Sequence, residues 1–166
     1  VFHSHTIRQV TEVRKALDAF FADHMAANIT DEDLRFLDDL LADIQRHLRD
    51  GKSYTDEDYQ FHNRLFEISG NPLAVQLFRI TWTVRLSSGD PMFWRPRQSR
   101  SELAIHANIV KALRARDAAA TRQAMLEHYA YTDAQLAKRL AAEEGPQSAD
   151  RTVRAAAHPA ANGKHP

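Results

Sequence analysis

The stretch Asp58-Tyr59-Gln60-Phe61-His62-Asn63-Arg64-Leu65 combines the apolar spacing of a helix with polar residues on the same face. On a helix its apolar residues Phe61 and Leu65 share one face with two polar residues, Asp58 and His62. An aspartate and a histidine thus stand where a helical bundle needs apolar side chains. A buried polar group without a partner costs about 1–3 kcal/mol, so these two side chains require one.

Two later helical segments repeat the pattern, each with a histidine on an apolar stripe. His106 and His128 both lie eleven residues from Asp117. If the two segments form a hairpin near Asp117, both imidazoles lie at one height, roughly 16 Å from the turn. The stripes that contain them are Leu103, Ile109, Val110 and Leu113 in the first segment and Met125, Thr132 and Leu136 in the second.

Together the four polar residues predict a divalent-metal site made of one carboxylate, Asp58, and three imidazoles, His62, His106 and His128. The sequence has no cysteine, so a metal would use only nitrogen and oxygen ligands. Zinc and nickel suit this set first, and iron and manganese also accept it. The alternative is a hydrogen-bonded Asp–His pair with two unrelated core histidines, and the pattern leaves both open.

Composition indicates one domain of 166 residues with a formal net charge of zero, from 22 Lys+Arg and 22 Asp+Glu. A DNA-binding chain usually has a basic excess, so direct DNA contact by these residues is not expected. No apolar run approaches the roughly 18 residues of a membrane span, and no signal peptide is evident, so a cytoplasmic protein is expected. Residues 145–166 are rich in Ala, Pro, Gly and Ser without periodicity, which predicts a disordered tail after a folded domain at 1–144.

Helical periodicity dominates the chain and predicts an all-α, antiparallel bundle of about six to seven helices. The fourth predicted helix is apolar nearly all round, so we expect it to be central or at a subunit interface. The predicted helices cover residues 6–27, 31–49, 55–69, 72–88, 98–115 and 117–142.

Two arginines are candidates for binding a ligand carboxylate. Arg14 lies between Val10, Val13 and Leu17 on the buried edge of the first predicted helix. Either its guanidinium holds a carboxylate in a pocket, or it reaches to solvent or pairs with Asp18 at i+4. Arg85, near the end of the fourth predicted helix, allows the same choice.

In order along the chain, several motifs resemble those of FCD domains, the effector-binding domains of one group of GntR-type bacterial transcription regulators. The resemblance covers roughly residues 7–142. The N-terminal motifs are Glu12-Val13-Arg14-Lys15-Ala16-Leu17-Asp18, Thr30-Asp31-Glu32-Asp33-Leu34, Asp58-Tyr59-Gln60-Phe61-His62 and Ser69-Gly70-Asn71-Pro72. The spacing of His106, Ile109, Ala112-Leu113, Asp117, Ala120, Met125 and His128 is similar to that of the family's last two helices.

The resemblance implies a metal bound by Asp58, His62, His106 and His128, and a small organic-acid effector beside it that the first-helix arginine, here Arg14, helps to bind. Two positions depart from the family pattern: Ile105 and Asp18 both stand where glutamate is usual. The resemblance also implies a DNA-binding winged helix-turn-helix domain upstream, which this chain does not contain.

The function expected from sequence is therefore a homodimeric, effector-sensing domain of a transcription regulator, and not an enzyme. One alternative is a metal-dependent helical-bundle hydrolase or transferase, since three imidazoles and an open position can activate water. No separate general base accompanies the set, which disfavours it. A dimerisation module without a ligand is a further alternative. Paired Glu-x-x-His motifs are missing, which argues against di-iron chemistry.

Overall fold

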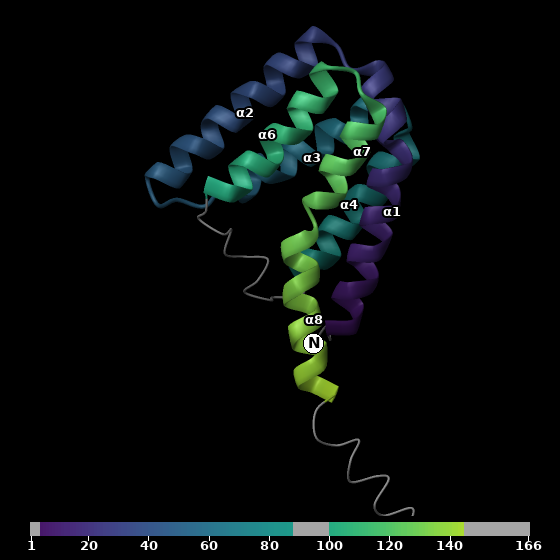
Figure 1. Ribbon diagram of the computed structural model, residues 1–166, viewed down its shortest axis with the longest axis vertical. Coiled ribbons are helices and arrows are strands. Elements are labelled where there is room, and N and C mark those ends of the chain that lie inside the picture. The colour runs from purple at the N-terminus through teal and green to yellow at the C-terminus, as the bar shows by residue number, and fades with distance from the viewer. Residues whose placement is uncertain (1–3, 88–99, 145–166) are drawn as a thin grey trace, which may run out of the picture.

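A computed structural model describes residues 4–87 and 100–144, and within these ranges it contains seven α-helices and no strand (Figure 1). The predicted all-α class is confirmed. The helices are α1 (Ser4–Asn28), α2 (Asp31–Arg49), α3 (Thr55–Ile68), α4 (Pro72–Ser87), α6 (Arg100–Arg114), α7 (Ala118–Glu127) and α8 (Ala130–Glu144).

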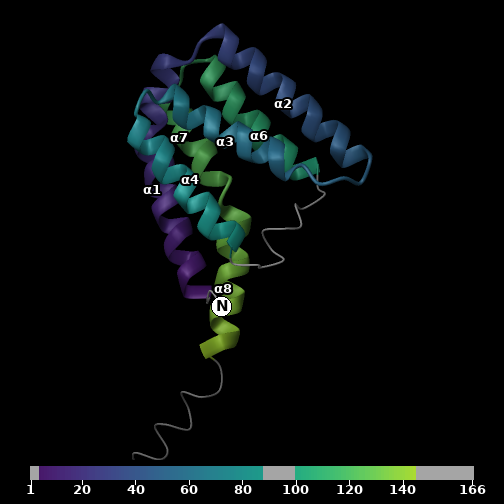
Figure 2. The same ribbon diagram turned by 180° about the vertical axis from the view of Figure 1, so that it is seen from behind.

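Six helices pack side by side in a closed ring, in the order α1, α7, α6, α2, α3, α4 and back to α1. Helices α1, α2 and α3 reverse direction in turn, as do α6 and α7, whereas α8 continues in the direction of α7 (Figures 1 and 2). The core inside the ring is rich in aromatic rings, with Phe61, Phe66 and Phe78 fully buried. Helix α8 extends beyond the ring and packs along the first half of α1.

Helix α2 begins with a complete capping box. The Thr30 side chain accepts a hydrogen bond from the Asp33 backbone N–H, and the Asp33 carboxylate accepts one from the Thr30 backbone N–H at 2.9 Å. These bonds satisfy two donors that a helix start otherwise leaves unpaired. The predicted start of this helix is therefore confirmed.

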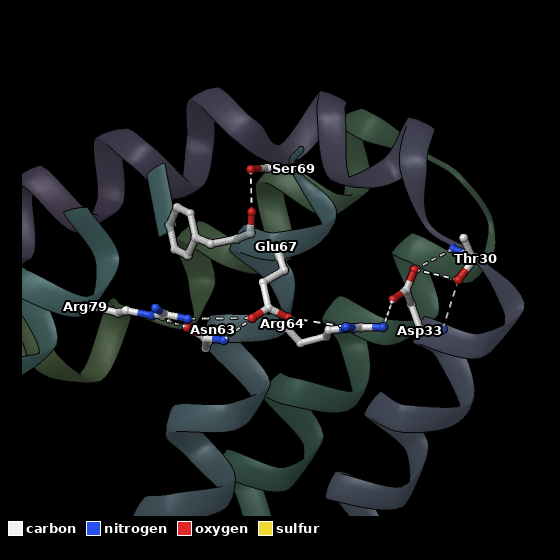
Figure 3. A network of polar contacts seen from close by, with 8 residues as sticks. Thr30, Asp33, Asn63, Arg64, Glu67, Ser69 and Arg79 are labelled. Carbon is white, nitrogen blue, oxygen red and sulfur yellow. Dashed lines mark hydrogen bonds and ion pairs between the residues drawn. The ribbon is translucent and has the colours of Figure 1, made fainter. Parts of the chain in front are cut away.

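A chain of polar contacts runs from this cap across α3 to α4 (Figure 3). Arg64 lies 2.7 Å from Asp33 and 3.3 Å from Glu67. Glu67 accepts a hydrogen bond from Asn63, whose side-chain oxygen in turn accepts one from Arg79 of α4. The network lies on the solvent side of α3, and it ties α2, α3 and α4 together away from the candidate metal ligands.

The α6–α7 hairpin closes through a Schellman turn with Arg116 in the left-handed position, at φ 53°. The Arg116 backbone N–H donates to the Leu113 carbonyl, and that of Asp117 donates to the Ala112 carbonyl. Asp117 then caps α7 by accepting a hydrogen bond from the Ala120 N–H. The turn predicted near Asp117 is thus present.

Two sequence predictions need correction. The single helix predicted over 117–142 is interrupted at residues 128–129 and forms α7 and α8. The Tyr129 backbone N–H donates to the Leu126 carbonyl, one residue nearer than an α-helix requires, so the last turn of α7 is tightened. Neither proline nor glycine lies at this break. It coincides instead with a tertiary contact, a hydrogen bond that the Tyr129 hydroxyl donates to Asp18.

Helix α4 is not central, contrary to one of the two expectations for it. It buries one face and leaves Leu73, Leu77 and Ile80 exposed at 66%, 37% and 58%. The other expectation, a subunit interface, stays a prediction. The start predicted at Gln98 and the tail predicted at 145–166 lie outside the described residues.

Candidate metal centre and adjoining cavity

The four candidate metal ligands come from three different elements and meet inside the ring. Asp58 and His62 are one turn apart on α3, His106 lies on α6, and His128 is the C-terminal cap residue of α7. One ligand atom from each residue can be chosen so that all four lie within 4.8 Å of one another. The convergence predicted from helical spacing is therefore present in the structure.

Asp58 lies at the centre of the polar contacts within the cluster. Its Oδ1 is 3.0 Å from Nε2 of His106 and 3.5 Å from Nε2 of His62. The ring of His128 is 4.7 Å from that of His62 and 4.9 Å from that of His106, measured between centroids. Three imidazoles thus crowd around one carboxylate in a site almost closed to solvent.

Two ring nitrogens of the cluster are buried without a hydrogen-bond partner: Nε2 of His62 and Nδ1 of His128. The 3.5 Å separation of His62 from Asp58 is an ion-pair contact and too long for a good hydrogen bond. Such orphaned nitrogens cost about 1–3 kcal/mol each, which a packed core does not normally retain. A ligated cation is the partner that would use both lone pairs.

The protonation states suit a cation. Burial lowers the pKa of His62, although Asp58 partly offsets the effect. Burial, together with the neighbouring histidines, lowers the pKa of His128 well below its usual range. Burial also disfavours the charged form of Asp58, but contacts with His106 and His62 outweigh this and hold its pKa well below normal. At neutral pH the cluster therefore offers His62 and His128 as neutral imidazoles beside a carboxylate, the state that metal binding requires.

The donor set fits a single divalent ion. In a tetrahedral site with bonds of about 2.1 Å, the ligand atoms are about 3.4 Å apart. The four atoms, which lie within 4.8 Å of one another, would each need to move by about an ångström or less to hold such an ion. The residues present therefore fit a zinc-type or nickel-type ion in an environment of nitrogen and oxygen ligands.

Arg14 is buried beside the cluster, with 4% of its surface exposed. Its guanidinium lies over the Phe78 ring at 4.6 Å and pairs with Asp18 at 3.9 Å. The ion pair of Arg14 with Asp18 that the sequence allowed is present, whereas the Arg14 side chain does not reach to solvent. Burial opposes the Arg14 charge, yet Tyr129 and Asp18 outweigh it, so the pKa of Arg14 is raised and the charge is retained.

Arg85 approaches the cluster from α4. Its guanidinium lies 3.4 Å from Oδ2 of Asp58 and over the Trp82 ring at 4.2 Å. Burial lowers the pKa of Arg85, though not enough to remove a charge with so high an intrinsic pKa. The structure thus places each candidate arginine next to a largely buried carboxylate, Arg14 beside Asp18 and Arg85 beside Asp58.

A cavity adjoins the cluster, with a volume of about 30 Å³, and both arginines and His128 line it. Sequence reasoning missed its other polar residues. Thr11 lies on the α1 stripe of Arg14 and Asp18, and Thr81 one turn before Arg85, so helical spacing from the arginines could have found both. The further polar lining residues are Thr6, Tyr129 and Thr132.

Comparison with known protein families identifies the family of this chain. The model of the FCD domain matches residues 9–131, a span that includes all four candidate ligands and both arginines. The chain belongs to the FCD domain family. This confirms the resemblance drawn from sequence.

Individual relatives agree with this assignment. The transcriptional regulatory protein NedR of Micromonospora viridifaciens is 34% identical to this FCD domain over 98 residues, which are 59% of this chain and 69% of that protein. Among solved structures, Streptococcus agalactiae GntR is 30% identical with a TM-score of 0.62, covering 74% of this chain and 55% of that one. E. coli McbR/YncC shares the fold, with a TM-score of 0.72, 20% identity and coverage of 81% and 69%.

NedR is named as a transcriptional regulatory protein, and FCD domains are domains of transcription regulators and not of enzymes. The chain spans only about half the length of the Streptococcus protein. In the described ranges, no helix is long and apolar enough to cross a bilayer.

Proposed function

We propose that this FCD domain is the effector-sensing and dimerisation part of a cytoplasmic GntR-family regulator. Asp58, His62, His106 and His128 would bind a divalent metal, with zinc or nickel foremost. The single observation that carries this is the pair of buried, unpartnered ring nitrogens within a four-residue donor cluster. When bound, the ion supplies a fixed positive charge and an open coordination position at the cavity.

The charges around the cavity favour an anionic effector. Without an ion, the positive charges of Arg14 and Arg85 are balanced by the negative charges of Asp18 and Asp58, which lie next to them. A divalent cation adds two positive charges that nothing else in this buried cluster offsets. A small carboxylate would restore the balance, with Arg14 and Arg85 as its partners, so we expect acid binding to depend on the metal.

The test measures acid binding by calorimetry on the metal-loaded and the chelator-stripped domain, with Arg14→Ala and the matched control Arg8→Ala. Arg8 is an exposed arginine of the same helix. We expect Arg14→Ala to weaken binding about 10- to 100-fold, because a charge-assisted hydrogen bond is lost, and Arg8→Ala to have no effect. Equal affinity in both variants would remove Arg14 from the effector site.

The exposed stripe of α4 supports a homodimer. Leu73, Leu77 and Ile80 follow one another at spacings of four and three, the repeat that pairs helices along an apolar seam. A second copy of the chain is the partner that this seam fits, since the two stripes would be identical across a twofold axis. In the complete regulator, the dimer would set the spacing of two upstream DNA-binding domains, and the effector would shift that spacing.

Sedimentation equilibrium tests the α4 seam through the double variant Leu77→Glu, Ile80→Glu. Gln9→Glu is the control, because it adds a charge to an exposed position of α1, outside the α4 stripe. We expect a dimer for wild type and control and a monomer for the double variant. A dimer in all three would place the interface elsewhere.

A further inference from the structure

Helix α8 lies outside the ring of six helices and is docked on the first half of α1 (Figure 1). Apolar and charged contacts hold it there. Leu136 packs on Ile7 in a small apolar cluster that is separate from the main core. Asp133 forms an ion pair with Lys15 at 2.6 Å, and both side chains are partly exposed. An ion pair open to solvent stabilises docking only weakly, so α8 can be released without opening the main core.

The junction between α7 and α8 joins this helix to the candidate metal centre. His128 belongs to the donor cluster, and the next residue, Tyr129, donates a hydrogen bond from its hydroxyl to Asp18 of α1. Consecutive residues of a helical chain point about 100° apart, so these adjacent side chains face two different partners. A movement of His128 therefore also moves the residue that anchors the start of α8.

The junction is a kink that the local sequence does not demand. The apolar pattern runs through residues 117–142 without proline or glycine, and His128 itself has helical angles, φ −56° and ψ −28°. An uninterrupted helix is therefore the alternative state of this segment, and the hydrogen bond of Tyr129 to Asp18 favours the kinked one. Straightening the junction would shift α8 relative to α1 and separate Leu136 and Asp133 from their partners.

Metal binding would favour the kinked state. The four ligand atoms lie within 4.8 Å of one another while α8 is docked, so the docked state is also the state in which the ligands converge. An ion that binds only when His128 faces the other donors stabilises every contact that depends on the same orientation. The anchor of Tyr129 on Asp18 is such a contact, because it lies one residue further along the chain.

We propose that α8 is a metal-linked element: occupation of the donor cluster docks α8 on α1, and loss of the ion releases it. This inference rests on the proposed metal binding and adds a consequence for the surface of the domain. Release would uncover Ile7 and Lys15, and Ile7 lies eleven residues before Asp18 on α1. Eleven residues of helix span about 16 Å, so the state of the buried site would be transmitted to the start of α1.

Hydrogen exchange followed by mass spectrometry tests the docking of α8 on the chelator-stripped and the zinc-loaded domain. We expect zinc to slow exchange of the α8 amides by about 5- to 150-fold, the usual range of coupling between two sites. The last turn of α2, residues 46–49, is the internal control, because α2 carries none of the candidate ligands. Exchange there should change by less than about 2-fold, since the end of a helix opens locally.

The reciprocal experiment weakens docking and measures zinc affinity by calorimetry. The double variant Asp133→Asn, Leu136→Ala removes both the ion pair and the apolar contact with α1. Leu136 lies eight residues after His128, about 12 Å along the helix, which is too far to disturb a ligand directly.

The matched control is the double variant Asp38→Asn, Leu40→Ala on α2. It also removes one exposed ion pair between helices and one largely buried leucine, but from a helix without a candidate ligand. Circular dichroism shows whether both double variants keep the helix content of the wild type. The exchange experiment on the wild type needs no substitution, so it decides the question even if a variant does not fold.

We expect zinc to bind the α8 variant at least about 5-fold more weakly than wild type, and the α2 control to bind zinc as wild type does. Coupling is reciprocal, so this loss of affinity should not exceed the factor by which zinc slows α8 exchange in the wild type. Unchanged α8 exchange on zinc loading, or equal zinc affinity in the two double variants, would overturn the inference and leave metal binding standing. If the wild type binds no zinc, the proposed metal centre fails, and the inference fails with it.

Discussion

Loading the metal-free domain with zinc should raise its melting temperature by on the order of 10 °C, and the variant His128→Ala should lose most of that increase. Nε2 of His62 and Nδ1 of His128 are buried without partners, and each costs about 1–3 kcal/mol in the metal-free state. An ion that ligates both would relieve about 2–6 kcal/mol. For a domain of this size each kcal/mol corresponds to roughly 2–4 °C.

The assay is a thermal melt followed by circular dichroism on chelator-stripped protein, with and without saturating zinc, together with metal content by mass spectrometry. His24→Ala is the control, since His24 is an exposed histidine on α1 outside the cluster. It should keep the full increase and one equivalent of metal. The reasoning is refuted if zinc leaves the wild-type melting temperature unchanged, or if His128→Ala gains as much as His24→Ala.

Three further predictions concern the buried histidines, Arg116 and the N-terminal cap of α2. Because burial holds the pKa values of His62 and His128 below that of an exposed imidazole, the unfolded chain takes up more protons under acid conditions. Metal-free stability should thus be full above about pH 6.5 and fall below it, and equal denaturation midpoints at pH 7 and 5 would contradict this. Arg116→Ala should lower the free energy of unfolding by about 1–2 kcal/mol, because two hydrogen bonds to carbonyls at the end of α1 are lost. Arg116→Gly should be more stable than Arg116→Ala by about 1 kcal/mol, because glycine adopts a positive φ without strain. Asp33→Ala should cost about 1–2 kcal/mol in urea denaturation by removing the capping box and the Arg64 ion pair, and an unchanged midpoint would show that the cap contributes nothing.

Helical arithmetic alone predicts the two pairs of donor residues, whereas the meeting of the two pairs also depends on how α3 packs relative to the α6–α7 hairpin. Equal distances of His106 and His128 from a capping aspartate place them at one height whatever the details of packing. Asp58 and His62 are four residues apart, so they share one face of any helix that contains both. The capping box at Thr30 is equally local, since its two hydrogen bonds join residues three apart.

The features that sequence reasoning missed depend on contacts between distant segments. The break at Tyr129 coincides with a hydrogen bond to Asp18, a residue 111 positions away. The apolar composition of α4 suggested a central helix, but composition does not say which side chains face the core. Helical spacing from Arg14 and Arg85 points to Thr11 and Thr81, but it does not mark them as cavity residues, because a threonine facing its own helix carbonyl occurs in many helices that bind nothing.

The α6–α7 hairpin has a consequence for how this chain tolerates insertions and deletions. Removing one residue between His106 and the Arg116 turn would rotate one imidazole by about 100° and move it about 1.5 Å along the helix axis, which takes it out of the cluster. A residue added in the 50–54 connection would leave the cluster intact, because Asp58 and His62 both lie on α3 and move together. Single-residue deletions across the hairpin should therefore abolish metal uptake, and single-residue insertions in the α2–α3 loop should preserve it, so the domain can vary in length at some positions and not at others.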